Sequence, residues 1–169
     1  DPEMSRGLGD VYKRQIQHAG VVVGLGGVAA PVLCKLPRDA EGYMGRLRCV
    51  QEISAVTAAC MMVKTSVFKA VGGFDEELKV AFNDIDLCMK VRKYGVKIVF
   101  TPYAELYHYE SKSRGMEDTP EKQLRFSREV NCFRRKWERE LLKGDPYYNP
   151  NLTLNNTDCS LRKQEKNGD

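Results

Sequence analysis

A chain of 169 residues, 42% of them hydrophobic, is long enough and apolar enough to bury one sizeable core. Its formal net charge of +4 comes from Lys and Arg interleaved with Asp and Glu, a distribution that argues against a nucleic-acid partner. The apolar stretches are too short to span a bilayer, and no secretory signal is visible. The six cysteines lack the spacing of a zinc site or a disulfide framework, so we expect reduced thiols in a cytoplasmic protein.

The first half of the chain predicts a buried strand and a short helix. Residues 1–15 show no apolar period and are interpreted as a non-native linker that lies outside the fold. Residues 53–63 carry no charge and are rich in small and β-branched side chains, which predicts a central buried strand. Residues 65–71 predict a short helix that ends at the pair Gly72 and Gly73.

A second helix is predicted to start at Asn83 or Asp84, because either side chain can cap the free amides, and to continue to Gly95. Residues 97–100 and 104–107 predict two short strands separated by a proline.

The C-terminal part of the chain predicts one long helix and a tail. Residues 120–142 are charged and amphipathic, as is typical of a helix with one buried face. Residues 163–169 are expected to be a disordered polar tail. The apolar stripe available to the helix consists of Leu124, Phe126, Val130, Phe133 and Trp137.

Three motifs follow one another in the middle of the chain: VGGFDEE at 71–77, FNDIDLC at 82–88 and AELYHYES at 104–111. Together they resemble the C-terminal, acceptor-side half of family 2 glycosyltransferases, and the resemblance covers residues 16–162. It implies an α/β protein with a partial GT-A fold, which is the Rossmann-like fold of nucleotide-diphospho-sugar transferases. In that fold a mixed sheet is flanked by helices, and here the N-terminal donor-binding half would be missing.

Asp84 is the candidate catalytic base. An inverting glycosyl transfer needs a base that takes the proton of the acceptor hydroxyl as its oxygen attacks the anomeric carbon. A carboxylate at a helix N-terminus suits this task, because the free amides and the helix dipole favour its negative charge. The resemblance implies the same residue, although Asn83 stands where many members carry glutamate. The alternative is that Asp84 only caps the helix. Asp86 points to another side of the helix and is expected either to support the site without contacting substrate or to be structural.

The first motif supplies the candidate acceptor contacts. Gly72 and Gly73 allow an acceptor to approach the main chain, or else they are a plain helix C-cap. The resemblance places this loop on the acceptor side of the cleft, where Asp75 would hydrogen-bond an acceptor hydroxyl.

The third motif supplies the candidate donor contacts. The resemblance implies that His108 reaches the metal ion, Mn²⁺ or Mg²⁺, or the diphosphate that an upstream DxD motif holds. Lys112 and Arg114 are expected to bind the diphosphate and offset its charge. The alternatives are a structural histidine and a solvated charged loop.

The sequence therefore predicts a fragment of a metal-dependent inverting glycosyltransferase. The enzyme would move a sugar from a nucleotide-diphosphate sugar to a glycan or lipid-linked acceptor, at the inner face of the membrane if the acceptor is a lipid. Without a donor-binding half, this chain alone is expected to be inactive. The alternative is a non-catalytic carbohydrate-binding or scaffold domain that retains the fold. A regulatory or nucleic-acid-binding module has only the mild basic charge in its favour.

Overall fold

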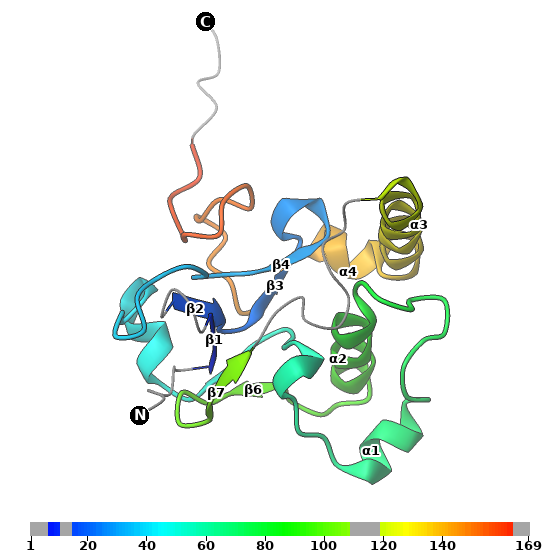
Figure 1. Cartoon of the computed structure of the whole chain (residues 1–169), viewed down its shortest axis with the longest axis horizontal. Helices are drawn as coiled ribbons and strands as arrows, with labels where there is room; N and C mark the ends of the chain where they lie inside the picture. Colours follow the sequence, from blue (N-terminus) through cyan, green and yellow to red (C-terminus); the bar gives the residue numbers. More distant parts are fainter. Residues whose placement is uncertain (1–6, 11–14, 109–118, 164–169) are drawn as a thin grey trace, which may run out of the picture.

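A computed structural model describes residues 7–10, 15–108 and 119–163, in which three small sheets are combined with four helices (Figure 1). The strands are β1 (Gly7–Asp10), β2 (Gln15–His18), β3 (Val21–Val23), β4 (Ala29–Pro31), β5 (Gln51–Glu52), β6 (Val99–Phe100) and β7 (Glu105–His108). The helices are α1 (Thr65–Ala70), α2 (Asn83–Lys93), α3 (Pro120–Lys136) and α4 (Glu138–Lys143), with 3₁₀ turns at Leu25–Gly27, Tyr43–Arg48 and Ala58–Cys60. The mixed α/β class is confirmed, and the GT-A topology stays a prediction.

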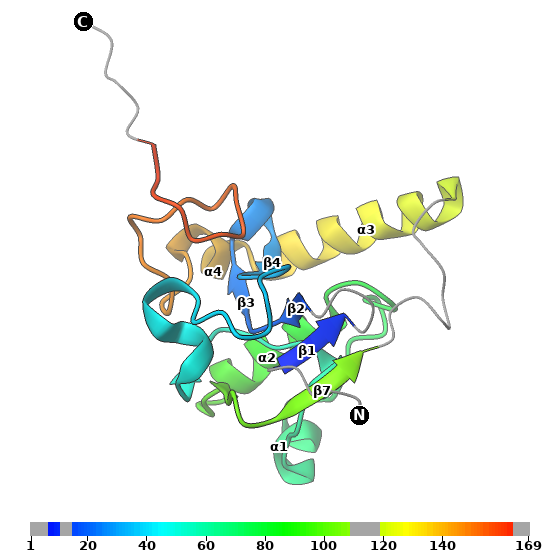
Figure 2. The same ribbon diagram turned by 60° about the vertical axis from the view of Figure 1, so that its left-hand side comes forward.

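The sheet β2-β1-β7 corrects one expectation from the sequence. β1 is its middle strand, antiparallel to β2 and parallel to β7 (Figure 2). The sequence predicts that residues 1–15 lie outside the fold, yet four of them form this strand. Backbone hydrogen bonds to two neighbouring strands can hold a GLGD segment in a sheet. Such bonds do not depend on the side chains, so the pattern of apolar residues does not predict them. Whether residues 1–15 are native is a separate question, and the linker interpretation stays a prediction.

The core consists of two apolar clusters on either side of β3. Because side chains alternate along a strand, Val22 packs in one cluster while Val21 and Val23 pack in the other. The first cluster lies under β2 and the C-terminal segment, where Leu152 is buried. The second joins α2 to the C-terminal part of α3, where Phe133 is fully buried. The candidate site lies beside this second cluster, because it is built on α2.

The predicted helix over 120–142 is broken in two. α3 ends at Lys136. The next residue, Trp137, has a backbone conformation (φ −113°, ψ 22°) outside the helical region, and α4 follows it. Phe133 and Trp137 are buried as predicted, but Leu124 and Phe126 are 54% and 44% exposed. The first turns of α3 project past the core (Figure 2), so this half of the predicted apolar stripe is only partly covered: Phe126 contacts the ring of Phe82, with 5.8 Å between the ring centroids.

The predicted central strand over 53–63 is wrong for most of its length. Ala55 forms a single bridge with Val21, the chain then turns at Ala58–Cys60, and Met62 is 99% exposed. A run of small, uncharged residues is compatible both with a strand and with an irregular segment whose amides are bound by side chains, so this pattern alone does not show which of the two forms. Residues 56–59 are such a segment.

Both shorter helices were predicted correctly. α1 ends at Ala70, and Gly72 and Gly73 follow it closely with φ values of 78° and 64° that suit glycine. α2 starts at Asn83, as expected, but Asn83 does not cap it. The residue before the first turn is Phe82, in a left-handed conformation and without a side-chain capping bond.

Candidate functional site around Asp84

Asp84 lies in the first turn of α2, where each of its carboxylate oxygens accepts one backbone hydrogen bond. Oδ1 accepts from the N–H of Ile85 at 2.9 Å, and Oδ2 accepts from the N–H of Ala58 at 3.1 Å. Each carboxylate oxygen can accept more than one bond, so both retain capacity for a further donor. Asp84 is thus oriented by the protein and still able to receive a proton.

The segment 56–59 that meets Asp84 is held in place by side chains. Four consecutive amides in this segment donate to side-chain acceptors: Val56 to Cys88 Sγ (3.5 Å), Thr57 to His18 Nε2 (3.1 Å), Ala58 to Asp84 Oδ2 (3.1 Å) and Ala59 to Thr57 Oγ1 (3.4 Å). Since each amide has a single N–H to donate, this stretch is not free to pair as a strand through these groups. The segment therefore connects α2 to β2 beside the candidate base.

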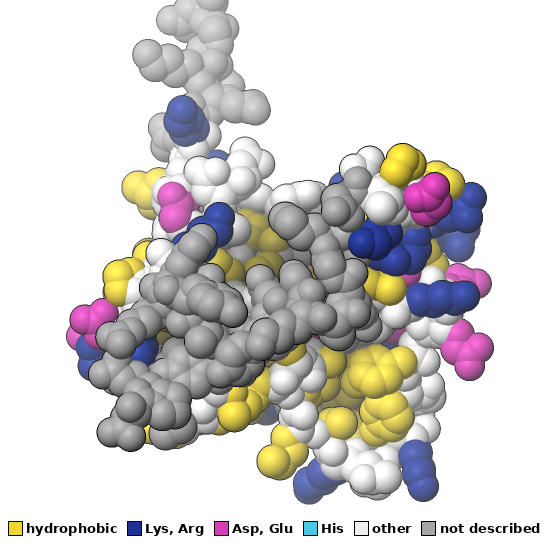
Figure 3. Space-filling view, in the orientation of Figure 1, with side chains coloured by type: hydrophobic (Ala, Val, Ile, Leu, Met, Phe, Trp, Pro, Cys, Tyr) yellow, Lys and Arg dark blue, Asp and Glu magenta, His cyan; other side chains and the backbone are white. Residues whose placement is uncertain are grey.

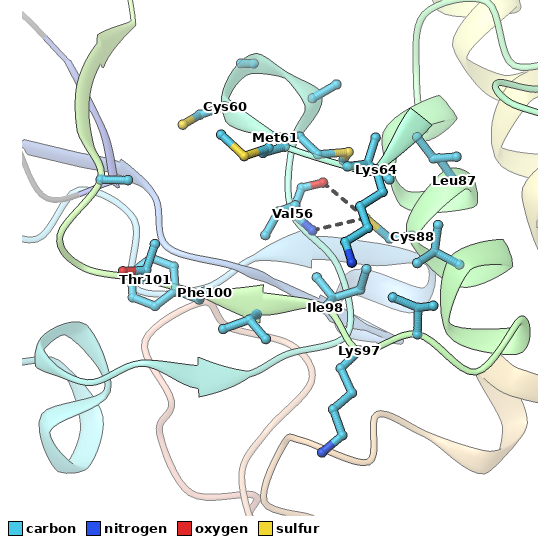
Figure 4. Close-up of a pocket in the computed structure, with 18 of the residues that line it drawn as sticks. Val56, Cys60, Met61, Lys64, Leu87, Cys88, Lys97, Ile98, Phe100 and Thr101 are labelled. Atoms are coloured by element: carbon cyan, nitrogen blue, oxygen red, sulfur yellow. Dashed lines mark hydrogen bonds between the residues drawn. The ribbon is translucent and has the colours of Figure 1, made fainter. Parts of the chain in front are cut away.

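A hollow of about 810 Å³ lies beside this segment. Figure 4 shows Met61 and Val56 on one side and Leu87 and Cys88 of α2 on another, with Ile98 nearby. Burial raises the pKa of Cys88 to about 11, so its thiol is neutral and acts as a packing group. Figure 3 shows that exposed hydrophobic side chains also gather on the face around α1. The walls of the hollow are mostly apolar, and Lys64 and Lys97 are the charged residues that line it.

Asp86 points away from Asp84 and is structural, as its place on the helix predicted. It is fully buried, accepts a hydrogen bond from Trp137 Nε1 at 2.8 Å, and forms ion pairs with Lys90 (3.2 Å) and Lys136 (2.8 Å). Lys90 also donates to the carbonyl of Gly73, and Lys136 also pairs with Asp75. Through Lys90 of α2 and Lys136 of α3, Asp86 therefore stabilises the position of the loop that follows α1.

The candidate acceptor contacts, Gly72, Gly73 and Asp75, lie in this loop after α1. The Lys136 ammonium, hydrogen-bonded to Asp75, holds the pKa of that carboxyl below its usual value, and the N–H of Glu77 donates to Asp75 at 3.0 Å. A Cβ added to Gly73 would lie 3.1 Å from the ring of Phe68, whereas one added to Gly72 would meet nothing within 4 Å. Gly72 thus has open space around it. Contact with an acceptor stays a prediction for all three residues.

The candidate donor contacts are only partly described. His108 is the last residue of β7 and lies opposite Asp10 of β1, but its side chain is not among those the structure describes. Lys112 and Arg114 lie outside the described residues. Within residues 7–10, 15–108 and 119–163, no three His, Cys, Asp or Glu side chains gather as a metal site.

His18 is a site residue that the sequence did not single out. Burial lowers the pKa of its imidazole to about 4, although the charge of nearby Asp84 raises it, so the ring is neutral at pH 7. A histidine in a short strand gives no periodic signal, and its partner Thr57 is distant in the sequence. Only the tertiary structure brings His18 to Asp84.

Comparison with known proteins finds relatives that are much longer than this chain. The chain is 57% identical over 148 residues to an uncharacterized protein, y4gI, of Sinorhizobium fredii, and 37% identical over 155 residues to the O-antigen biosynthesis protein RfbC of Myxococcus xanthus. These alignments cover 87% and 91% of this chain but only 16% and 12% of the relatives.

A shorter match covers 37% of the chain. Over 62 residues it is 36% identical to the N-acetylglucosaminyl-diphospho-decaprenol L-rhamnosyltransferase of Mycobacterium tuberculosis, of which the match covers 20%. No family model and no solved structure matches the chain. The names of the relatives support a glycosyltransferase relationship for this chain.

Proposed function

We propose that this chain is the acceptor-side part of a longer, inverting family 2 glycosyltransferase, and that Asp84 is its catalytic base. The observation that carries the proposal is the geometry of Asp84, which is oriented by two backbone amides and keeps acceptor capacity on both oxygens. The relatives named for O-antigen biosynthesis and rhamnosyl transfer support the same reaction class. Loss of transfer on substitution of Asp84 tests the proposal.

In the proposed reaction, the acceptor hydroxyl gives its proton to the carboxylate of Asp84. The hydroxyl oxygen forms a bond to the anomeric carbon of the donor sugar from the side opposite the leaving group. The bond between that carbon and the diphosphate oxygen breaks, and its electron pair leaves with the nucleoside diphosphate. The products are an inverted glycosidic bond, a protonated Asp84 and a free nucleoside diphosphate.

The proposed substrates are a nucleotide-diphosphate sugar and a glycan or lipid-linked acceptor. One relative is named for a decaprenol-linked substrate, which supports a lipid-linked acceptor. No helix in the described part of the chain is long and apolar enough to cross a membrane. Independently of that finding, we propose that a lipid acceptor would bring the enzyme to the cytoplasmic face of the membrane.

The donor side of the proposal concerns His108, Lys112 and Arg114. We propose that His108 contacts Mn²⁺ or Mg²⁺, or the diphosphate itself, and that the two cations offset the charge of the leaving group. The described residues do not assemble a metal site by themselves. The remaining ligands would therefore have to come from outside these residues.

Replacing His108 with alanine in the longer enzyme is expected to raise the Mn²⁺ concentration needed for half-maximal activity by about tenfold or more. The expected physical reason is the loss of one contact to the metal or diphosphate. Titration of activity and donor binding with Mn²⁺ measures the change, and Tyr107→Phe at the neighbouring position serves as the control. An unchanged metal response and donor affinity in folded His108→Ala would make His108 structural.

A further inference from the structure

Two adjacent amides in the segment 56–59 are bound by side chains from different elements. The N–H of Thr57 donates to Nε2 of His18, the last residue of β2. The next N–H along the chain, that of Ala58, donates to Oδ2 of Asp84 in α2. The two N–H groups lie in consecutive peptide planes that meet at the Cα of Thr57. With the Thr57 backbone at φ −74° and ψ 145°, the bond that fixes the first plane also restricts the direction of the second donor.

We propose that His18 is a positioning residue for Asp84 and acts through the Thr57 and Ala58 amides. The imidazole holds the Thr57 amide against β2, and this orients the Ala58 amide toward the carboxylate. His18 need not touch the substrate in this arrangement. We call the two bonds His18–Thr57 and Asp84–Ala58 the relay. Its importance for catalysis rests on the proposed role of Asp84, whereas the bonds themselves can be measured without any transfer reaction.

The charge state of His18 suits this task. Nε2 can accept a hydrogen bond only while it is unprotonated, so the proton of the neutral ring must lie on Nδ1. Among the described side chains, the charged group that acts on the ring is Asp84 of α2, and the segment 56–59 contributes only backbone groups next to it. Burial outweighs Asp84 and lowers the pKa to about 4. The relay is therefore complete at neutral pH and lost as the pH falls through about 4.

The competing explanation is that the segment is fixed without His18. The bond from Val56 to Cys88 precedes the relay, and the bond from Ala59 to Thr57 follows it. If these two bonds were sufficient, removal of the imidazole would leave the Ala58 amide as well protected as before.

Amide hydrogen exchange of this chain, measured by NMR, separates the two explanations. In His18→Ala we expect Ala58 to exchange about tenfold faster relative to the amide of Leu87 in α2, as expected for the loss of one hydrogen bond. In His18→Gln the side-chain oxygen can accept from Thr57, so protection of Ala58 should return. Ile16→Val, a core change in the same strand, should leave the ratio unchanged. Unchanged protection of Ala58 in His18→Ala would overturn the relay.

Two further measurements keep the proposal testable if His18→Ala does not fold. In the unmodified chain, protection of Ala58 should be lost together with the titration of His18 near pH 4, and protection that persists below that pH would overturn the relay. In the longer enzyme, we expect His18→Ala to lower kcat with little change in the KM for donor, and His18→Gln to restore kcat. A normal kcat in folded His18→Ala would overturn the positioning role. If Asp84→Asn were active, the proposed function would fail while the exchange result stood.

Discussion

Replacing Asp84 with asparagine in the longer enzyme is expected to slow sugar transfer by about two to four orders of magnitude, which is the usual effect of removing a general base. The amide oxygen of asparagine can still accept from the N–H of Ala58, so the segment 56–59 should keep its place. Only the capacity to take the acceptor proton is removed. Single-turnover transfer at saturating donor measures the loss, and a parallel binding titration should show a nearly unchanged donor affinity.

The matched control for this experiment is Asp39→Asn, which makes the same chemical change at an exposed position away from the site. It should transfer sugar at the normal rate. Near-normal turnover in folded Asp84→Asn would mean that the base is another residue and that Asp84 only orders the start of α2. A parallel loss of donor affinity would instead indicate that Asp84 contributes to binding.

Replacing Asp86 with alanine is expected to destabilise the described fold by about 3–5 kcal/mol, the usual cost of removing one partner from a buried ion pair. The change would leave Lys136 and Lys90 without their buried counter-charge and the Trp137 indole N–H without its acceptor. Denaturant unfolding of the chain, followed by Trp137 fluorescence, measures the loss.

Two companion variants identify the origin of that loss. Asp86→Asn keeps an acceptor for Trp137 and should be less destabilising than Asp86→Ala. Adding Lys136→Met to Asp86→Ala removes one of the two ammonium groups that have lost Asp86. The double variant should therefore lose less stability than the sum of the two single losses, because the two residues are in contact. A loss below about 1 kcal/mol in Asp86→Ala would show that the buried pairs contribute little.

The parts of the fold that depend on local chemistry were predictable from the sequence. α1 and α2 have the expected ends, because left-handed glycines and an amphipathic period act over a few residues. The prediction of a strand over 53–63 was wrong, because the amides of Thr57 and Ala58 are bound by side chains that come from distant parts of the chain. β1 was not predicted, because its backbone pairs with β2 and β7 while its sequence, GLGD, has no strand-like pattern of apolar residues.

In the candidate site, too, local features were predictable from the sequence and tertiary contacts were not. The place of Asp84 at the start of α2 follows from the sequence, because a helix start is a local feature. Its contact with Ala58 and its proximity to His18 do not, because they depend on how β2 and α2 pack. The ion pairs of Asp75 and Asp86 with Lys136 were equally invisible, since Lys136 comes from a helix much later in the chain.

The most direct test of the central claim is to incubate the longer enzyme with nucleotide-diphosphate sugars, Mn²⁺ and a lipid-linked or glycan acceptor. Mass spectrometry then follows the acceptor, and a coupled assay follows release of the nucleoside diphosphate. We predict an acceptor that is heavier by one sugar residue, formed together with one nucleoside diphosphate, and almost no product from Asp84→Asn. Tight binding of the acceptor by the folded wild-type enzyme without product, across the donors tried, would contradict the account and indicate a carbohydrate-binding or scaffold domain.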